Sequence, residues 1–312
     1  MVEVRGACAE PRDHLPRCWF DNHLTGIIDT MNSSSRVAVV GTLNLDQVVH
    51  VERLPADGET VLGLSQTERP GGKGANQAAA AAAITSTSLI AAVGDDAAGT
   101  TMLEYQRAQG VDVEHVRRVT GLSGRAVIEV DADGTNRIIV LSGANAELTP
   151  DHVTASLDAL DPEVVLTQLE SPREVTDAAA RWCRAHLRRF VLNPSPVAAL
   201  DDSILALADP LVVNEIEAAY YGTADDLELL AQRLRSRCTS AVITLGAEGV
   251  LVVDDGRVTR INVRGVTAVD TTGAGDVFAG TLVAHLAAGI ELPEAASLAA
   301  DTATDFVSRP RT

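Results

Sequence analysis

The sequence predicts an α/β fold, with a doubly wound, mostly parallel β-sheet flanked by helices and a small β-sheet lid. Short apolar runs alternate with helical patterns from Arg36 onward, and each run is continuously apolar. Strands of a parallel sheet that helices cover on both faces have this composition. Two stretches of mixed polarity interrupt the alternation, and these predict the lid.

The predicted strands and helices follow one another in a regular order. The strands are expected at 37–41, 88–93, 164–169, 190–193, 211–214 and 241–245. Helical patterns occur at about 73–84, 97–109, 172–187, 215–221 and 225–237, and a further Ala-rich stretch covers 275–288. This alternation is typical of a doubly wound sheet.

The lid strands are expected within about 48–69 and 123–142, the second as a hairpin around Asp133-Gly134. Strands of mixed polarity cannot extend a sheet that is buried on both faces. We therefore expect a separate small sheet over one edge. Lids of this kind exclude water during transfer chemistry.

Residues 1–30 differ from the rest of the chain. They mix Pro, Cys, His and charged residues without periodicity, and they contain no apolar segment typical of a signal peptide. We expect an extension that is disordered or is not part of the native protein, in which case Met31 is the natural start. Residues 31–312 are expected to form a single domain.

Composition excludes several functional classes. The formal net charge of −18 opposes binding to nucleic acid and to anionic membranes. Aromatic residues make up only 3% of the chain, which disfavours a surface that stacks the bases of single-stranded nucleic acid. The apolar runs are too short to span a bilayer. The four cysteines lack metal-ligand spacing and are expected to be buried or idle thiols in a reducing, cytoplasmic compartment (Cys8, Cys18, Cys183, Cys238).

The strongest local motif is Asp270-Thr271-Thr272-Gly273-Ala274-Gly275-Asp276, at the start of the Ala-rich stretch. Small residues at a helix start allow backbone N–H groups to converge on an anion. A carboxylate beside that anion site suits a base that takes a proton from an attacking hydroxyl. The alternative is a helix-capping Asp with glycines that only allow close helix packing.

A second glycine motif, Gly71-Gly72-Lys73-Gly74-Ala75-Asn76, also precedes an Ala-rich helix. It is not a Walker A loop, because glycine follows the lysine. Lys73 is the single lysine among 25 basic residues, and its ammonium and the Asn76 amide could bind the hydroxyls of a polyol. A simple turn before a helix, with a lysine retained by chance, is the alternative.

Asn44 and Asp46 follow the first predicted strand, where open α/β sheets bind ligands. An Asp can accept two sugar hydroxyls, and an Asn can both donate and accept. The chain has no G-x-G-x-x-G after this strand, so a dinucleotide-binding dehydrogenase is disfavoured.

These three segments, in this order and spacing, resemble the ribokinase-like carbohydrate kinases. The resemblance covers about 36–308 and is supported by segments around Gly58, Gly143, Gln168, Asn214 and Thr244. It implies an ATP-dependent kinase that phosphorylates the 5-hydroxyl of a sugar, with Mg²⁺ accompanying ATP and K⁺ as an activating cation. Asp46, Lys73 and Glu170 point to D-ribose. The resemblance also implies a homodimer formed through the lid.

The resemblance implies a role for each matching position. The sugar would be bound by Asn44, Leu45, Asp46, Gly72, Lys73, Gly74, Ala75, Asn76 and Glu170, with Asp276 as the general base. The anion hole would be formed by Gly273, Ala274 and Gly275. The nucleotide would contact Asn214, Thr244, Leu245, Gly246, Ala247, Glu248, Gly249, Gly275 and Asp276. Glu217 would order Mg²⁺ through water, and Asp270 and Thr272 would bind K⁺.

The chain departs from the family pattern near its C-terminus. Family members continue with a Gly-containing loop and a final helix, and Ala300 replaces the Asn or His that often faces the nucleotide. We expect a truncated C-terminus, with consequences for cation activation and ATP binding. The alternatives are a kinase of another furanose, nucleoside or deoxy-sugar, or a catalytically impaired sugar-binding protein.

Overall fold

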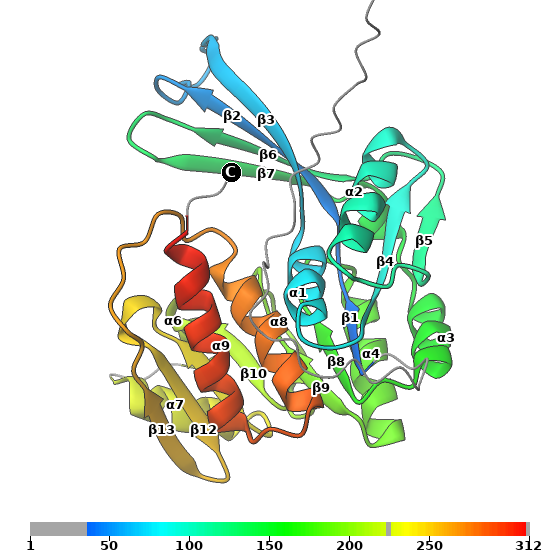
Figure 1. Ribbon diagram of the computed structural model, residues 1–312, viewed down its shortest axis with the longest axis vertical. Helices are drawn as coiled ribbons and strands as arrows, with labels where there is room; N and C mark the ends of the chain where they lie inside the picture. Colours follow the sequence, from blue (N-terminus) through cyan, green and yellow to red (C-terminus); the bar gives the residue numbers. More distant parts are fainter. Residues whose placement is uncertain (1–35, 223–225, 310–312) are drawn as a thin grey trace, which may run out of the picture.

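The computed structural model describes residues 36–222 and 226–309 (Figure 1). The predicted extension at residues 1–30 lies outside these residues, and so do Cys8 and Cys18. Within the described residues, a nine-stranded sheet has the order β13-β12-β11-β10-β9-β8-β1-β4-β5. Its strands are β1 (Val37–Val40), β4 (Thr87–Gly94), β5 (Val116–Val119), β8 (Val164–Thr167), β9 (Arg189–Leu192), β10 (Leu211–Asn214), β11 (Ala241–Thr244), β12 (Val250–Asp254) and β13 (Arg257–Ile261).

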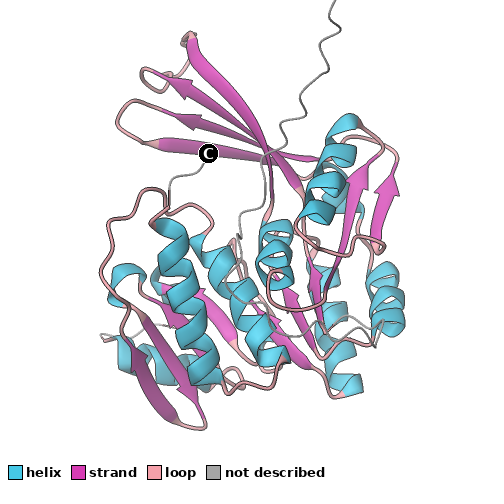
Figure 2. Ribbon diagram, viewed as in Figure 1, coloured by secondary structure: helices cyan, strands magenta, loops and turns pink. Residues whose placement is uncertain are grey.

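Helices cover both faces of this sheet (Figure 2). One face packs against α1 (Lys73–Ala82), α2 (Ala97–Ala108), α8 (Ala274–Ala287) and α9 (Leu292–Val307). The other packs against α3 (Pro150–Leu160), α4 (Arg173–His186), α5 (Asp202–Leu205), α6 (Glu215–Tyr221) and α7 (Leu227–Arg235). Two short 3₁₀ helices, η1 (Gly143–Glu147) and η2 (Gly246–Glu248), complete the described helical elements.

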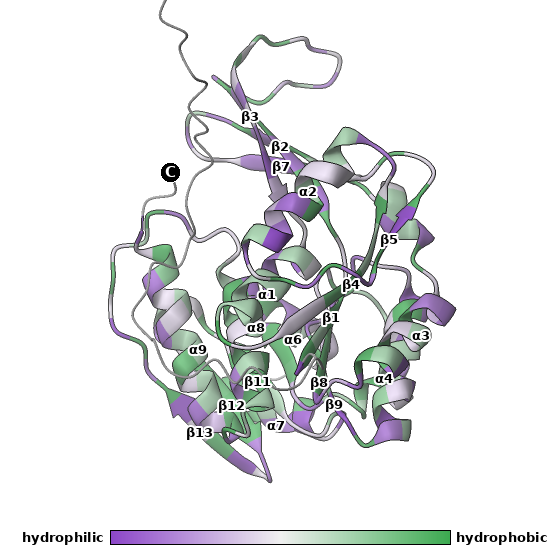
Figure 3. Cartoon of the chain, turned by 45° about the vertical axis from the view of Figure 1, so that its right-hand side comes forward, coloured by the Kyte–Doolittle hydropathy of each residue, from purple (hydrophilic) through white to green (hydrophobic). Residues whose placement is uncertain are grey.

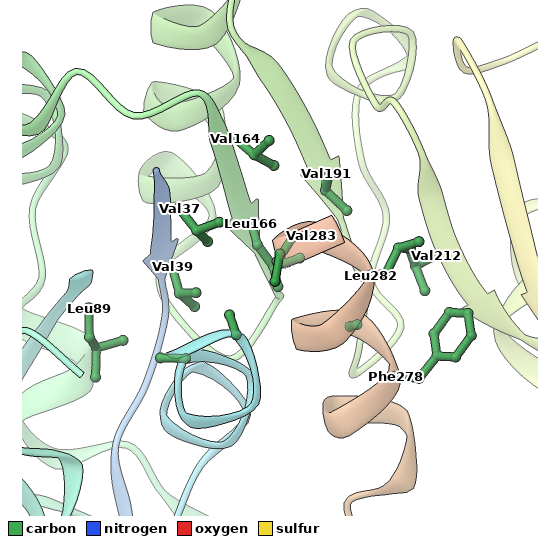
Figure 4. Close-up of a cluster of buried hydrophobic side chains, with 14 of the residues drawn as sticks. Val37, Val39, Leu89, Val164, Leu166, Val191, Val212, Phe278, Leu282 and Val283 are labelled. Atoms are coloured by element: carbon green, nitrogen blue, oxygen red, sulfur yellow. The ribbon is translucent and has the colours of Figure 1, made fainter. Parts of the chain in front are cut away.

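The strands are continuously apolar because each face of the sheet has its own hydrophobic core. In β1, Val37 and Val39 belong to the core beneath α1 and α8, whereas Ala38 and Val40 belong to the opposite core. Figure 4 shows Phe278 and Leu282 of α8 directed toward the sheet. Hydrophobic residues accordingly follow the central strands and α8, and hydrophilic residues gather on outer turns (Figure 3).

The predicted doubly wound sheet is confirmed, and each predicted strand and helix ends within two residues of its observed position. The sequence did not predict the strands at the two edges of this sheet, β5 on one side and β12 and β13 on the other. Across the sheet, neighbouring strands pair in parallel in the order β5-β4-β1-β8-β9-β10-β11. At the other edge, β12 pairs antiparallel with both β11 and β13. β12 and β13 form a hairpin at this edge of the sheet, and the helices α3, α5 and α9 were also not predicted.

The predicted lid is a four-stranded sheet in the order β3-β2-β6-β7. Its strands are β2 (Asn44–Val51), β3 (Gly63–Gly71), β6 (Gly124–Val130) and β7 (Asn136–Leu141), and β6 and β7 form the expected hairpin. β2 begins four residues before the predicted stretch, because Asn44 pairs with Gly71 on one side and Gly124 on the other. Asn44 and Asp46 therefore lie in the lid and not in a turn.

The part of the chain that the structure describes contains no helix that is both long and apolar enough to cross a membrane.

The helices α1 and α8 lie side by side and carry the residues of the site described below (Figure 1). Gly280 allows this close approach, because a Cβ at Gly280 would lie 2.8 Å from the Ala80 Cβ and 3.0 Å from the Gln77 carbonyl carbon. The packing of α1 on α8 thus depends on a missing side chain.

We expect Gly280→Ala to lower the free energy of unfolding by about 1–3 kcal/mol, because α1 must move away from α8. Gly265→Ala is the matched control, since a Cβ at Gly265 meets no atom within 4 Å. Urea denaturation of both variants measures the difference. Equal stability of the two variants would contradict this account of the helix contact.

Candidate active site

The candidate site lies at the carboxyl ends of the parallel strands, where the strand order reverses between β1 and β8. Open α/β sheets bind ligands at such a point. Here the Thr42 hydroxyl, which follows β1, donates a hydrogen bond to the Glu170 carboxylate, which follows β8. The same carboxylate accepts the Lys73 backbone N–H at 3.0 Å. Glu170 therefore joins both strand ends to the start of α1.

The loop before α1 has a backbone that only glycine fits. Gly72 has a φ of +93°, and a Cβ there would lie 2.8 Å from the Asn44 backbone nitrogen. This turn brings Lys73, Asn76 and Gln77 onto one face of α1, at positions i, i+3 and i+4.

Asp276 lies in the first turn of α8 and is 7% exposed. Its Oδ2 accepts the Asn76 amide at 3.1 Å, and its Oδ1 accepts the Gln77 amide at 2.9 Å. Burial raises the pKa of Asp276, while the Lys73 ammonium and the two amide donors oppose the increase. The arrangement thus holds a buried carboxylate and supports its ionised form.

A glycine-containing backbone forms the start of α8 beside Asp276. Gly273 precedes α8 with a φ of +77°, and a Cβ at Gly275 would meet no atom within 4 Å. The Ala274 N–H already donates to the Thr271 carbonyl at 3.2 Å. A cavity of about 210 Å³ borders this helix start, and it is lined by Lys73, Asn193, Ser195, Val212, Val213, Asn214, Glu217, Thr244, Gly273, Gly275 and Asp276. An ammonium and a helix N-terminus at one cavity suit a phosphate group.

A second, more apolar cavity of about 300 Å³ lies on the other side of the α8 start. Thr244, Gly246, Ala247 and Gly249 line it, together with Ala300 and other residues of α8 and α9. Two residues predicted to contact a nucleotide project elsewhere. Glu248 is ion-paired with Arg260 at 3.0 Å, and Leu245 is buried in the core opposite α8.

Asn214 and Glu217 form a capping box at the start of α6. The Glu217 backbone N–H donates to Asn214 Oδ1 at 2.8 Å, and the Asn214 backbone N–H donates to Glu217 Oε2 at 2.9 Å. Both residues line the 210 Å³ cavity. The cap therefore fixes a largely buried carboxylate at the edge of this cavity.

Asp46 lines a third cavity, of about 130 Å³, together with Gly71, Asn76, Gly273 and Arg69 among others. In the β2–β3 register Asp46 lies directly opposite Arg69. Burial raises the pKa of Asp46 to about 6, despite the opposing charge of Arg69. The charges of Glu170 and Asp276 contribute to this increase.

The remaining predicted residues have the following positions. The side chains of Leu45 and Ala75 are buried in the core, so these residues can reach a ligand through their backbones. Gly74 is buried at the start of α1. The Thr272 backbone N–H donates to Asp270 Oδ1 at 2.8 Å, and Thr272 lines the 130 Å³ cavity, whereas Asp270 lines none of the three cavities.

Sequence reasoning assigned no role to several polar residues that the structure brings to the site. Gln77 contacts Asp276 directly, and Gln168 and Asn193 contact Gln77. The signals were present: Gln77 shares a helix face with Lys73 and Asn76, and the other two residues directly follow β8 and β9. Arg69 and Tyr105, which line the 130 Å³ cavity, were also not identified.

Comparison with known proteins agrees with this geometry. The family model described as pfkB family carbohydrate kinase matches residues 34–312. The ribokinase of Bacillus subtilis is 35% identical over 262 residues, which cover 83% of this chain and 88% of that protein. The chain therefore belongs to the pfkB family of carbohydrate kinases and is a ribokinase-family sugar kinase.

Solved structures of ribokinases share this fold. A crystal structure of ribokinase from Thermotoga maritima superposes with a TM-score of 0.82 at 31% identity, covering 88% of this chain and 93% of that one. The structure of Arabidopsis thaliana ribokinase complexed with ribose and ATP superposes with a TM-score of 0.81 at 27% identity, covering 89% and 94%.

The raised pKa of Asp46 predicts a pH-dependent stability. Well below the ordinary pKa of 3.8 the carboxyl is protonated in both the folded and the unfolded state. Stability decreases as the pH rises from there to about 6, and the loss is complete above about 6. We expect the free energy of unfolding of Asp46→Asn to exceed that of the parent protein by about 2 kcal/mol at pH 8, and to differ little from it at pH 4. Urea denaturation at both pH values measures this.

The control is Asp133→Asn, which removes an exposed carboxylate in the β6–β7 turn. It should leave stability unchanged at both pH values. A parent protein as stable as Asp46→Asn at pH 8 would show that the Asp46 carboxylate is not destabilised in the fold.

Proposed function

We propose that this protein transfers the γ-phosphoryl group of ATP to the 5-hydroxyl of D-ribose, giving D-ribose 5-phosphate and ADP. The observation that carries the proposal is the position of Asp276. A buried carboxylate, fixed by two amide donors, borders the same cavity as the start of α8 and Lys73. A phosphoryl acceptor and a phosphoryl group could meet there.

The sugar would occupy the space between the lid and the start of α1. Asn44, Asp46 and Glu170 would accept or donate hydrogen bonds to its hydroxyls, and the loop from Gly72 to Asn76 would contact it closely. The similarity to a ribokinase solved with ribose and ATP supports ribose as the substrate. The compact Lys73 ammonium acts on Asp276, while the Lys73 backbone N–H donates to Glu170.

In the proposed reaction, Asp276 Oδ2 takes the proton of the 5-hydroxyl as that oxygen attacks the γ-phosphorus. The new bond joins the sugar oxygen to phosphorus, and the bond from the γ-phosphorus to the bridging oxygen of ADP breaks. The backbone at Gly273–Gly275 and the Lys73 ammonium would stabilise charge on the transferred group. The adenine would occupy the apolar cavity between the β11 turn and α9.

The residues present fit the proposed cations to different degrees. Mg²⁺ is bound in proteins through one or two carboxylates, waters and substrate phosphates, and Glu217 supplies one carboxylate at the phosphate cavity. When bound, Mg²⁺ would neutralise charge on the phosphates. Asp270 and Thr272 offer oxygens for K⁺ near the start of α8, and we propose K⁺ as an activator.

We also propose a homodimer formed through the lid. Leu64 on β3 is 69% exposed, and Leu62 in the loop before β3 is 88% exposed. The opposite edge strand of the lid, β7, exposes Ile138, Ile139, Val140 and Leu141. Exposed apolar residues concentrated on one small sheet are typical of a protein interface.

The proposed function is tested by ADP release from MgATP with a panel of acceptors: ribose, 2-deoxyribose, fructose and adenosine, each with KCl or NaCl. We expect turnover to be highest with ribose and to increase with K⁺. Turnover with another acceptor and not with ribose would contradict the substrate assignment. Ribose binding without turnover would indicate a sugar-binding protein.

We expect Asp276→Asn to lower turnover by a factor on the order of 10²–10⁴, with little change in ribose affinity, because it removes the general base and retains the shape of the side chain. Steady-state kinetics with calorimetric ribose binding measures both quantities. Asp254→Asn is the control, since Asp254 ends β12 outside the three cavities. Near-parental turnover of Asp276→Asn would remove Asp276 from this role.

A further inference from the structure

A chain of buried amides lies behind Asp276. Gln77, on α1, is fully buried, and Gln168 and Asn193 follow β8 and β9. Gln77 Nε2 donates to Asp276 Oδ1 at 2.9 Å and to Asn193 Oδ1 at 3.1 Å. Gln77 Oε1 accepts the amide of Gln168 at 2.5 Å. The Gln77 amide thus makes three hydrogen bonds, two as donor and one as acceptor.

These contacts fix which end of the Gln77 amide faces Asp276. Rotation of the amide by 180° would direct Oε1 at two oxygens, those of Asp276 and Asn193, and would direct its NH₂ group at the amide of Gln168. Asn193 is itself held, because its Nδ2 donates to the Val212 carbonyl of β10 at 2.9 Å. The carboxyl ends of three adjacent strands therefore determine the orientation of one side chain on α1.

The two oxygens of Asp276 are held differently. The partner of Oδ1, Gln77, is fully buried, whereas the partner of Oδ2, Asn76, is partly exposed and lines the cavity proposed for the sugar. A sugar that binds Asn76 could displace that amide from Oδ2 and leave Oδ1 occupied. Only one oxygen would then be available to accept the proton of a hydroxyl.

We propose that Gln77 is a positioning residue for the phosphoryl transfer: held in one orientation by Gln168 and Asn193, its amide fixes the Asp276 carboxylate so that Oδ2 faces the sugar hydroxyl. This inference rests on the proposed function. Gln77 does not itself touch the substrate, and it acts through Asp276.

Replacement of Gln77 should affect the charge state of Asp276 as well as its orientation. A hydrogen bond to a carboxylate favours the ionised form, so its loss raises the pKa of Asp276. The other charged groups that act on Asp276 are Lys73 on α1 and Glu170 after β8, and Asp276 in turn acts on Asp46 of the lid. Lys73, Glu170 and Asp46 are all retained in the variants below, so a shift in the pKa of Asp276 reports on the loss of the Gln77 amide.

The test compares Gln77→Met, Gln168→Met and the control Gln106→Met. Gln106 is a buried glutamine on α2 without a hydrogen bond to Asp276, and its Oε1 has no hydrogen-bond partner among the described residues. For each protein, kcat and the KM for ribose are measured between about pH 5 and 9 with saturating MgATP and KCl. Circular dichroism and thermal unfolding establish that each variant is folded.

We expect Gln77→Met to lower kcat at pH 7 by about 10- to 100-fold, with the KM for ribose changed less than about threefold. The acid limb of its kcat profile should move to higher pH by about one unit, because a base with a raised pKa loses activity at a higher pH. Gln168→Met should show a smaller shift in the same direction, and Gln106→Met should show none.

A uniform loss of kcat in Gln77→Met with an unmoved acid limb would overturn the proposal, as would an equal shift in Gln106→Met. A second measurement does not require turnover: the titration of the Asp276 carboxyl carbon by ¹³C NMR, assigned by its disappearance in Asp276→Asn. An unchanged Asp276 titration in Gln77→Met would also overturn the proposal. If the parent protein phosphorylates no sugar, the proposed function fails, and this titration still decides whether Gln77 controls the carboxylate.

Discussion

The rest of the site depends on one contact, that between the first turns of α1 and α8. Two amides on α1 reach the Asp276 carboxylate on α8, and the two helices approach closely because Gly280 has no side chain. An isolated carboxylate buried to this degree would be expected to be neutral. The amides and the Lys73 ammonium offset part of the lost hydration, although burial still raises the pKa of Asp276.

The balance of charge around Asp276 explains several features of the sequence. The charges of Glu170 and Asp276 raise the pKa of Asp46 and Arg69 opposes them, while Glu170 raises the pKa of Asp276 and Lys73 opposes it. Lys73 is the single lysine in a chain whose other basic residues are arginine. A compact ammonium suits the cavity that Lys73 shares with Asp276 at a helix start, where a planar guanidinium would need more space. Electrostatic compensation therefore restricts residue choice at this position.

Much of the fold could be predicted because the signals were local. Continuous apolar strands such as 164–167 and Ala-rich helices such as α8 follow from composition and periodicity alone. The hairpin of β12 and β13 was not identified, because an apolar run gives no information on strand direction. Asp46 was recognised as a candidate sugar ligand, but its partner Arg69 was not, since their pairing depends on the register between β2 and β3.

The candidate site shows the same difference between local sequence signals and contacts that depend on the fold. Asp276, Lys73 and Asn76 belong to short motifs with recognisable spacing, and the structure brings them to one location. Gln168 and Asn193 are separated from Gln77 in the sequence by long segments, so their contacts appear only when β8 and β9 are placed side by side. The amide chain is a product of sheet topology, and no linear pattern contains it.

The central claim is that a sugar hydroxyl meets Asp276 between α1 and the lid. A crystal structure with ribose and a non-hydrolysable ATP analogue tests it most directly. We predict the 5-oxygen within about 2.6–3.2 Å of Asp276 Oδ2, with the Gln77 amide still on Oδ1 and the γ-phosphate at the start of α8. Ribose bound with its 5-oxygen out of hydrogen-bonding reach of Asp276 would contradict the account.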